Sequence, residues 1–459
     1  MDENARPCPG CGERDRAIDE LKKRVAKLEK RLDESARAGK RQAAPFSKGF
    51  PQEQPKRPGR KAGAKHGTHG HRPPPLVDEI DEVLEAPLPD ACPHCGGEIA
   101  EDDDVDEQFQ ADIPVTPMRR KFRIHKGCCK RCQRRVRGRH PLQTSDATGA
   151  AASQIGPNAQ AGIVYLNKRS GMSYGKIADY FKEANGLELK PSTCTRIVLR
   201  AADKLQPVYE EIQDSIKNSH AITPDETGWR LGGRPVWLHA WVGDRATCYA
   251  IDPHRSADAL EKVIGIDYSG TLIHDGASSY ERFLRALHQQ CVAHPLRRAH
   301  DLEKDQNGSA REFPRKVIDL LQGALDIRDA FHDGELSCDD LDGAYTNHIA
   351  RLKRLTQGRD GGEVNDVFAR HLRRHAADWF LFFLEPGQPA TNYLAEQALR
   401  TPIVNRKVFG GNRTEAGCQA QAITSSTIQT CRQQKRSAFA FLRETMCNLV
   451  QSIFTAITR

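Results

Sequence analysis

Three carboxylates between residues 225 and 396 have the types and local contexts that metal-dependent chemistry requires. Asp225 follows a short apolar run and precedes two expected strands, Asp275 closes the expected strand 271–274, and Glu396 lies on an expected helix, 392–400. Two aspartates at strand ends and a glutamate on a later helix can hold two Mg²⁺ ions about 4 Å apart and clamp both oxygens of a phosphodiester exchange. Any one of these acids alone is more often exposed or a helix cap, so only the ordered set supports this chemistry.

Two pairs of cysteines have the spacing of metal-binding turns. Cys92 and Cys95 form one C-x2-C pair, and Cys129 and Cys132 form a second. Each pair can aim two thiolates at one ion, and two pairs complete a tetrahedral four-cysteine zinc site. We therefore predict a zinc-ribbon module, with Cys128 as a competing ligand for Cys129.

Other thiols and histidines leave their role open. Cys8 and Cys11 form a third C-x2-C pair, either free or completed by a second copy of the chain in a parallel coiled coil. Cys291 and His294 would make only half of a metal site. Packing, or positioning of DNA near the three acids, is the favoured interpretation for them.

Charge is strongly segregated along the chain, although the formal net charge is only +8. Residues 78–112 hold 14 acids and no Lys or Arg, whereas 119–139 hold 11 Lys and Arg and no acid. Basic blocks this dense favour a polyanion as partner, and a solubilising surface is the alternative. The candidate DNA contacts are Arg57, Arg60, Lys61, Arg131, Arg134, Arg135, Arg196, Arg400, Arg406 and Lys407.

The N-terminal half contains elements suited to assembly and binding. Residues 15–36 carry a 3-4-3-4 apolar seam typical of a coiled coil, and the Pro-, Gly- and Lys-rich stretch that follows reads as a solvated tether. Because a helix on a tether needs a partner to cover its seam, we expect a homo-oligomer. Residues 155–210 are expected to be helical with a break at Asn185-Gly186, which resembles a helix-turn-helix.

Composition excludes two classes of protein. No run approaches the roughly 20 apolar residues of a membrane helix, and the charged N-terminus argues against an export signal. Fourteen cysteines in such a chain indicate metal ligands and buried thiols in a reducing compartment rather than disulfides. We expect a cytoplasmic, nucleoid-associated protein without membrane contact.

The sequence resembles the transposases of the insertion-sequence-sixty-six family, in the form of the large transposase C protein. The resemblance rests on the zipper helix, the PGRK linker, CPHCGG, DETGW, HDGASSYERF and NYLAEQALRTPIVNRK, in the family's order. It implies a multidomain α/β protein with a ribonuclease-H-like core, a helical insertion and a DDE triad, which maps onto Asp225, Asp275 and Glu396. It further implies Mg²⁺-dependent cleavage and strand transfer at the ends of an insertion sequence, on double-stranded DNA, with accessory proteins of the same element as further partners.

The expected domains follow the chain in order. They are a knuckle and coiled coil (1–43), a basic linker (44–76), a zinc ribbon (77–142), a helical DNA-binding region (143–215), the first part of the core (216–290), a helical insertion (291–389), the core helix with the catalytic glutamate (390–435) and a C-terminal helix (436–459). Two alternatives stay open, namely a catalytically inactive regulator derived from a transposase and a nuclease of the same fold.

Overall fold

The computed structural model describes Val25 and residues 74–84, 89–90, 94–98, 107–111, 113, 116–149, 154–361, 363–449 and 452–454. The chain divides into two compact units, Met1–Pro114 and Val115–Arg459. Within the first unit, the described residues include the short 3-10 helix η1 (Val77–Glu79), and Val25 is helical. The rest of the expected coiled coil and most of the expected tether lie outside the described residues.

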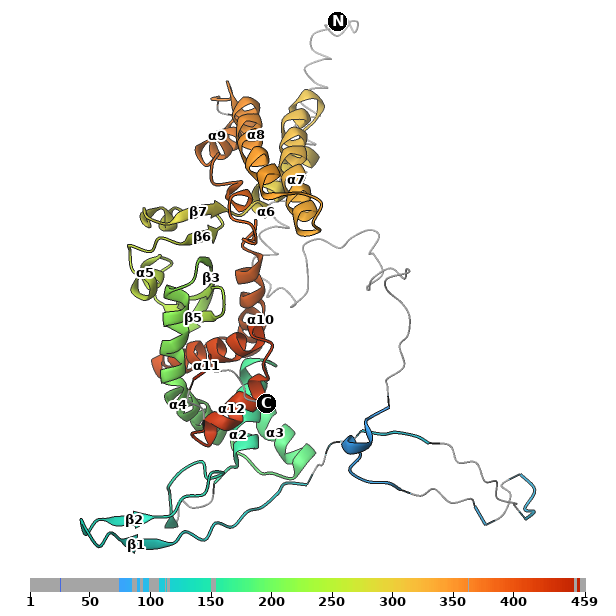
Figure 1. Cartoon of the computed structure of the whole chain (residues 1–459), viewed down its shortest axis with the longest axis vertical. Coiled ribbons are helices and arrows are strands. Elements are labelled where there is room, and N and C mark those ends of the chain that lie inside the picture. The colour runs from blue at the N-terminus through green and yellow to red at the C-terminus, as the bar shows by residue number, and fades with distance from the viewer. Residues whose placement is uncertain are drawn as a thin grey trace, which may run out of the picture. The chain divides into compact units, whose positions relative to one another are not determined.

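A five-stranded mixed sheet organises the second unit (Figure 1). Its strands, in spatial order, are β5 (Thr247–Asp252), β4 (Arg234–Val242), β3 (Ala221–Leu231), β6 (Thr271–His274) and β7 (Leu287–Gln290). The first three are antiparallel neighbours, whereas β3, β6 and β7 run parallel. The mixed α/β class expected from the sequence is confirmed.

Alternation along β4 explains why the sheet is covered on both faces. Leu238 and Ala240 point into one apolar cluster, and Trp241 points into another. Because side chains alternate across a strand, this pattern requires helices on each side of the sheet.

One face is covered by helices from both ends of the unit. They are α2 (Pro157–Lys168), α3 (Tyr174–Asn185), α4 (Pro191–Lys217), α5 (Asp258–Ile264), α11 (Glu415–Gln433) and α12 (Ala438–Met446). Ile197 and Leu205 of α4 lie in the same core cluster as Ile222 and Leu272 of the sheet. The helices of the expected region 143–215 therefore share a core with the sheet, and the DNA-binding role of that region stays a prediction. Amphipathic helices show that one face is buried, but not against which partner.

The predicted break at Asn185-Gly186, between α3 and α4, is confirmed in detail. The Ser173 hydroxyl accepts the Lys176 amide at the start of α3, and Gly186 ends that helix at φ +62°, a conformation that glycine adopts without strain. Pro191 then opens α4 at its first turn, where a missing amide hydrogen costs nothing.

Helix α11 closes the exposed edge of the sheet. The outward-facing amides of Thr247 and Tyr249 on β5 donate to the hydroxyls of Thr430 and Ser426, at 3.1 and 2.8 Å. An edge strand normally leaves such amides unpaired. This role explains why a buried helix is rich in serine and threonine.

The opposite face of the sheet carries a single long helix, α10 (Tyr393–Phe409), which runs beside the strands in Figure 1. Ala395, Ala398 and Leu399 of this helix pack with Trp229 and Leu238 of the sheet. Small residues at the contact allow the helix to approach the strands closely.

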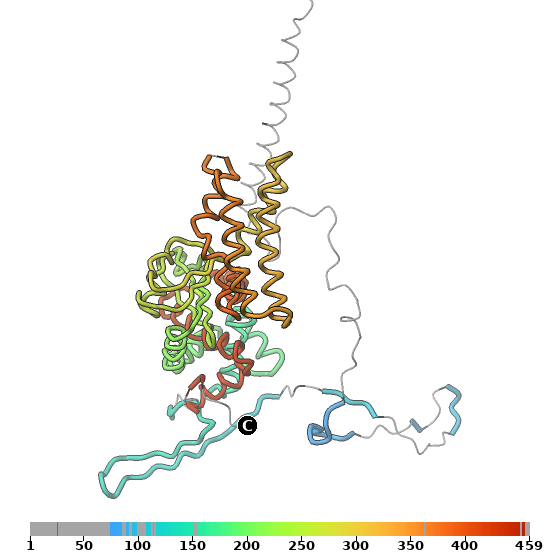
Figure 2. The backbone as a smooth tube through the Cα atoms, turned by 45° about the horizontal axis from the view of Figure 1, so that its top comes forward, coloured from blue at the N-terminus to red at the C-terminus, as the bar shows by residue number. Residues whose placement is uncertain are grey.

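A group of helices between β7 and α10 forms its own apolar core, and its helices stand side by side in Figure 2. They are α6 (Ala293–Asp305), α7 (Glu312–His332), α8 (Cys338–Thr356) and α9 (Val364–Arg374), with the short 3-10 helices η3 (Ser278–Arg282) before them and η4 (Gly308–Arg311) and η5 (Leu381–Phe383) between or after them. Phe313 and Phe368 meet edge to face in this core.

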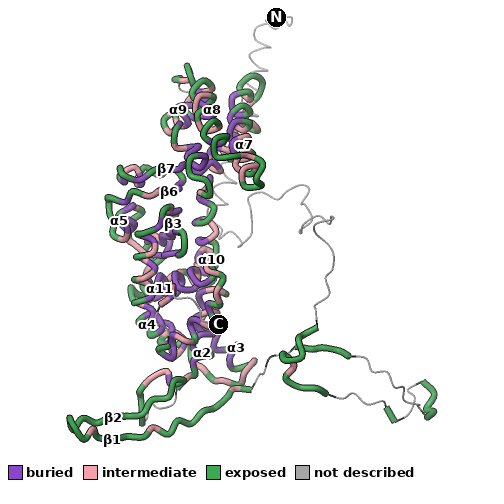
Figure 3. The backbone as a smooth tube through the Cα atoms, in the orientation of Figure 1, coloured by how far each residue is buried: buried purple, intermediate pink, exposed green. Residues whose placement is uncertain are grey.

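A two-stranded antiparallel hairpin lies earlier in the chain, formed by β1 (Lys126–Cys128) and β2 (Arg135–Arg137). All six residues of these strands are exposed (Figure 3). Among the described residues, no helix has the length and apolar character needed to cross a membrane.

Candidate active site

The register of two parallel strands places the first two acids level with each other. Ala221 pairs with Thr271 and Ile222 with Leu272, an offset of 50 residues. Asp225 and Asp275 are separated by the same number (275 − 225 = 50), so each lies three positions beyond the last pair, Ile222–Leu272. The acids therefore flank the point where the two strands separate.

The expectation that both aspartates sit at strand ends is half right. Asp275 directly follows β6, but Asp225 is the fifth residue of β3, which continues to Leu231 through antiparallel pairing with β4. The motif around Asp225 was expected before the strand pair. It instead forms part of β3, because residues 223–231 pair along their whole length with β4.

The third acid approaches from the helix on the same face. Asp225 is paired in register with Ala240, which belongs to the apolar cluster beneath α10. Glu396 lies in the first turn of α10, beside Ala395 of that cluster. Asp225 and Glu396 therefore belong to the same side of the sheet.

The pKa of Asp225 reflects the presence of the other acids nearby. The pKa of Asp225 is raised to about 7, chiefly by burial and in smaller part by the negative charges of Glu226, Asp275 and Glu396, while a 2.8 Å hydrogen bond from the Glu226 amide opposes the shift. Like charges act over a few ångströms inside a protein. Within the described residues, no three His, Cys, Asp or Glu side chains enclose a single point closely enough to share an ion as they stand.

The turn that carries Asp275 is built from its neighbours. Gly276 adopts φ +90°, and a Cβ there would lie 2.8 Å from the Gln290 side-chain oxygen, so only glycine fits. The Gly276 amide donates to Nδ1 of His274, which leaves the proton of that neutral ring on Nε2, 3.0 Å from Nδ1 of His288. Burial lowers the pKa of His274 to about 3, so the imidazole stays uncharged beside the acid.

Glu226 faces the other side of the sheet. Its carboxylate accepts hydrogen bonds from Nε of Arg255 at 2.7 Å and from the Tyr280 hydroxyl at 3.2 Å. Arg255 in turn lies over the ring of Trp237. These contacts were not expected from the sequence, because no local pattern links residues 29 and 54 positions apart.

Cys291 and His294 lie next to the third acid. The Cys291 thiol is buried, which raises its pKa, and it accepts hydrogen bonds from the backbone of Asn392 while the charge of Glu396 raises the pKa further. The Cys291 amide donates to the carbonyl of His274. Nδ1 of His294 is buried without a hydrogen-bond partner among the described residues.

The candidate DNA contacts fall into three groups. Arg406 donates to the Thr227 hydroxyl at 3.4 Å, beside the strand of Asp225, and Arg400 and Lys407 are exposed on the same helix. Arg196 is exposed on α4. The hairpin and the turn before β2 carry Arg131, Arg134 and Arg135, all exposed, whereas Arg57, Arg60 and Lys61 lie outside the described residues.

The cysteine pairs are only partly described. At the second pair, backbone amides of Cys132 and Arg131 donate to the Cys129 sulfur and lower its pKa, the arrangement of a metal-binding turn. The Cys128 thiol instead donates to the Gln133 carbonyl at 3.2 Å. Cys95 is exposed in the first unit, and Cys92, like Cys8 and Cys11, lies outside the described residues.

Helix α10, which carries Glu396, is held in place by hydrogen bonds to the end of α2. The Asn405 side chain on α10 donates to the Lys168 carbonyl at 2.7 Å, and Arg169 donates to the Thr401 hydroxyl. Burial lowers the pKa of the Lys168 ammonium to about 7. The sequence offered no sign of these contacts, which join α2 to a helix more than 200 residues later.

The sheet and its helices define a mixed α/β domain. It carries one acid on a strand, one directly after a strand and one on a facing helix. A model of the Transposase IS66 family matches residues 152–420. The match covers more than half of the chain, and the chain belongs to this family. It is also similar to the uncharacterized protein y4hP of Sinorhizobium fredii (strain NBRC 101917 / NGR234), with 22% identity over 438 residues, 83% of this chain and 75% of that protein.

Proposed function

We infer that the protein is a DNA transposase that binds the ends of its mobile element and catalyses DNA cleavage and strand transfer through Asp225, Asp275 and Glu396. One observation carries this proposal: the charges of Asp275 and Glu396, from two other elements, both act on the half-buried carboxyl of Asp225. Membership of a transposase family supports the same conclusion.

The order of the strands supports the ribonuclease-H-like core implied by the sequence. Three antiparallel strands precede two parallel ones, and the acids come from the central strand β3, from the end of its parallel neighbour β6 and from the helix α10 on one face. The group of helices from α6 to α9 separates the second acid from the third in the chain.

The donor set fits Mg²⁺. Carboxylate oxygens are the ligands that this hard cation prefers, and a divalent ion would offset the mutual repulsion that raises the pKa of Asp225. Asp225, Asp275 and Glu396 would hold two ions. When bound, Mg²⁺ supplies activation of the attacking water or 3′-hydroxyl and stabilisation of the leaving oxygen.

The neighbouring groups hold the three acids in place and lower the repulsion between them and DNA. The Glu226 amide fixes one oxygen of Asp225, the Gly276 turn fixes the backbone of Asp275, and packing under α10 fixes Glu396. Arg406, which reaches Thr227 two residues beyond Asp225, and Lys407 on the same helix would lower the repulsion that a phosphodiester meets as it approaches the carboxylates.

The N-terminal modules would recognise DNA and pair protomers. We propose that Cys92, Cys95, Cys129 and Cys132 bind one Zn²⁺, whose preference for thiolates fits the amides aimed at Cys129. The basic hairpin and exposed Arg196 would contact the element ends, and the coiled coil in 1–43 would form the homo-oligomer. Accessory proteins of the same element and a cytoplasmic, nucleoid-associated location belong to the same proposal.

Incubation of the full chain with Mg²⁺ and labelled duplexes carrying the element ends tests the proposal. Joined strands are expected alongside cut ones. Cut products without joining would indicate the nuclease alternative. Binding without any cutting would indicate the inactive regulator, against which the presence of all three acids argues.

A further inference from the structure

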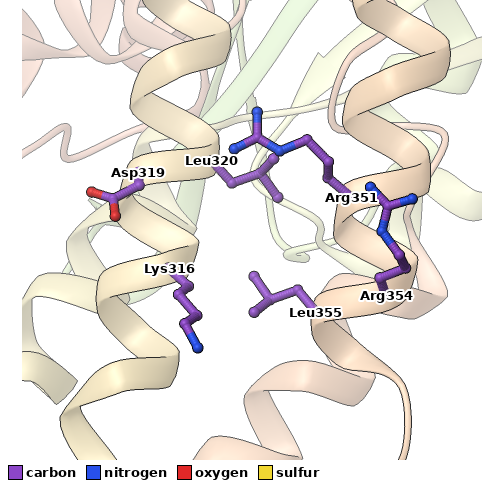
Figure 4. Close-up of a pocket in the computed structure, with 6 residues that line it drawn as sticks. All are labelled: Lys316, Asp319, Leu320, Arg351, Arg354 and Leu355. Atoms are coloured by element: carbon purple, nitrogen blue, oxygen red, sulfur yellow. The ribbon is translucent and has the colours of Figure 1, made fainter.

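A cleft opens between α7 and α8 in the helical insertion, away from the residues assigned to the active site. It has a volume of about 310 Å³. Figure 4 shows the residues that line it, which are Lys316, Asp319 and Leu320 on α7 and Arg351, Arg354 and Leu355 on α8. On each helix the first lining residue lies three and four positions before the other two, so the three residues share one face.

The cleft combines an apolar base with excess positive charge. Leu320 is 2% exposed and packs into the core of the insertion, whereas Lys316, Arg351 and Arg354 are exposed. The one acid, Asp319, points away from the space between the helices in Figure 4. Three cations therefore face this space without an acid directed into it.

The two arginines are also free of carboxylate partners. Lys316 makes an exposed ion pair with Glu312 at 3.6 Å, but among the described residues no carboxylate lies within ion-pair distance of Arg351 or Arg354. Nearby arginines of the insertion are paired, for example Arg315 with Glu303 at 2.8 Å. Both guanidinium groups that line the cleft therefore lack a carboxylate partner among the described residues.

The charge distribution along α8 explains how the helix tolerates this cluster. Its acids, Asp339, Asp340 and Asp342, lie in the first turns, and its arginines lie near the end. Carbonyl groups at the C-terminus of a helix favour positive side chains. The arginines can therefore remain unpaired at little cost and stay available for an external anion.

We propose that this cleft binds the phosphodiester backbone of DNA through Arg351, Arg354 and Lys316. The choice of DNA as the anion rests on the proposed function. Guanidinium groups match phosphate oxygens in a forked geometry, and the apolar base can receive a sugar edge. The proposed contact is with the backbone, which carries no sequence information directly, so binding at this cleft should not depend on the DNA sequence.

Binding of the full chain to a duplex of arbitrary sequence, followed from 50 to 200 mM NaCl, tests the proposal. Each phosphate contact adds about 0.9 to the slope of log affinity against log salt. Arg351→Gln combined with Arg354→Gln should reduce the slope by about 2 and weaken binding about tenfold or more near 100 mM salt. Arg351→Lys with Arg354→Lys keeps the charge and should keep the slope.

Lys353→Gln is the matched control, because Lys353 is exposed on the same helix and does not line the cleft. An unchanged slope in the double glutamine variant, or an equal loss in Lys353→Gln, overturns the proposal. The thermal midpoint should stay unchanged in each variant, since all three side chains are exposed.

The experiments distinguish failure of the proposed DNA binding at the cleft from failure of the proposed transposase activity. A chain that cuts and joins DNA while the double variant keeps the wild-type slope contradicts the cleft alone. A chain whose slope falls as expected but which neither cuts nor joins contradicts the transposase activity alone.

Discussion

The Tyr249 hydroxyl donates a 2.8 Å hydrogen bond to the carbonyl of Ala398 on α10. In an α-helix that carbonyl would accept the amide four residues later, but residue 402 is a proline and has no amide hydrogen. Tyr249 is 2% exposed, so water cannot replace it. A side chain of the sheet thus satisfies the helix two residues from Glu396.

Tyr249→Phe should therefore loosen the helix that carries the third acid. Loss of this buried hydrogen bond should lower the free energy of unfolding by about 1–3 kcal/mol, because the Ala398 carbonyl is left unpaired. Chemical denaturation measures the loss. A second substitution, Pro402→Ala, restores the amide and should recover part of it, whereas equal destabilisation in both backgrounds would contradict the explanation.

Lys168 should make the stability of the fold depend on pH. Its ammonium group is buried, 4% exposed, and donates to Gln421 at 2.8 Å, and its pKa falls from 10.5 to about 7. Between these values only the unfolded chain holds the proton. The free energy of unfolding should therefore rise as pH increases from 7, by up to about 1.4 kcal/mol per pH unit.

Lys168→Met removes this titration. The unfolding free energy of the wild type should rise by about 2 kcal/mol relative to that of the variant between pH 7 and pH 9. Lys182→Met, at an exposed position on α3, serves as control and should follow the wild type at each pH. Parallel curves for wild type and Lys168→Met would show that the lysine does not titrate in this range.

Glu226 and Arg255 should be energetically coupled. The Glu226 side chain is 8% exposed and the Arg255 side chain 57%, so the pair lies at the edge of the protein and is partly screened. Glu226→Gln should cost about 1–2 kcal/mol of stability, and a double-mutant cycle with Arg255→Ala should give a coupling of about 1 kcal/mol. Strict additivity would mean that the 2.7 Å contact contributes nothing.

Zinc binding should depend on one cysteine of the adjacent pair and not on the other. Metal analysis of the full chain should find one zinc, and Cys129→Ser should lower the occupancy sharply, since its sulfur receives the turn amides. Cys128→Ser should keep full occupancy, because that thiol donates to a backbone carbonyl. The reverse result would move the ligand to Cys128.

The sequence predicted the local elements well. The strands expected at 236–242, 247–251 and 271–274 correspond to β4, β5 and β6, and the expected break falls at Gly186. Alternation, β-branched residues and turn chemistry predict such elements because they act over a few residues. The three acids could be proposed as metal ligands from the sequence, because each is identified by the few residues around it.

Tertiary relationships could not be predicted in the same way. Proline at 402 predicts that the carbonyl of residue 398 lacks its helical partner, but the sequence does not indicate that Tyr249 supplies the donor. The amphipathic helices of 157–217 reveal a buried face, but not that the sheet shares it. Such partners are determined by packing between segments far apart in the chain.

The most direct test compares Asp225→Asn with Glu226→Gln in a Mg²⁺-dependent cleavage and strand-transfer assay on element ends. The neighbours face opposite sides of the sheet, so only Asp225 can act with Asp275 and Glu396. Asp225→Asn should lower both rates by about a thousandfold or more, a barrier increase of about 4 kcal/mol, with DNA binding unchanged. Glu226→Gln should lower them less than about tenfold. If Asp225→Asn stays active, or if Glu226→Gln is the variant that loses activity, the assignment of the catalytic acids is wrong.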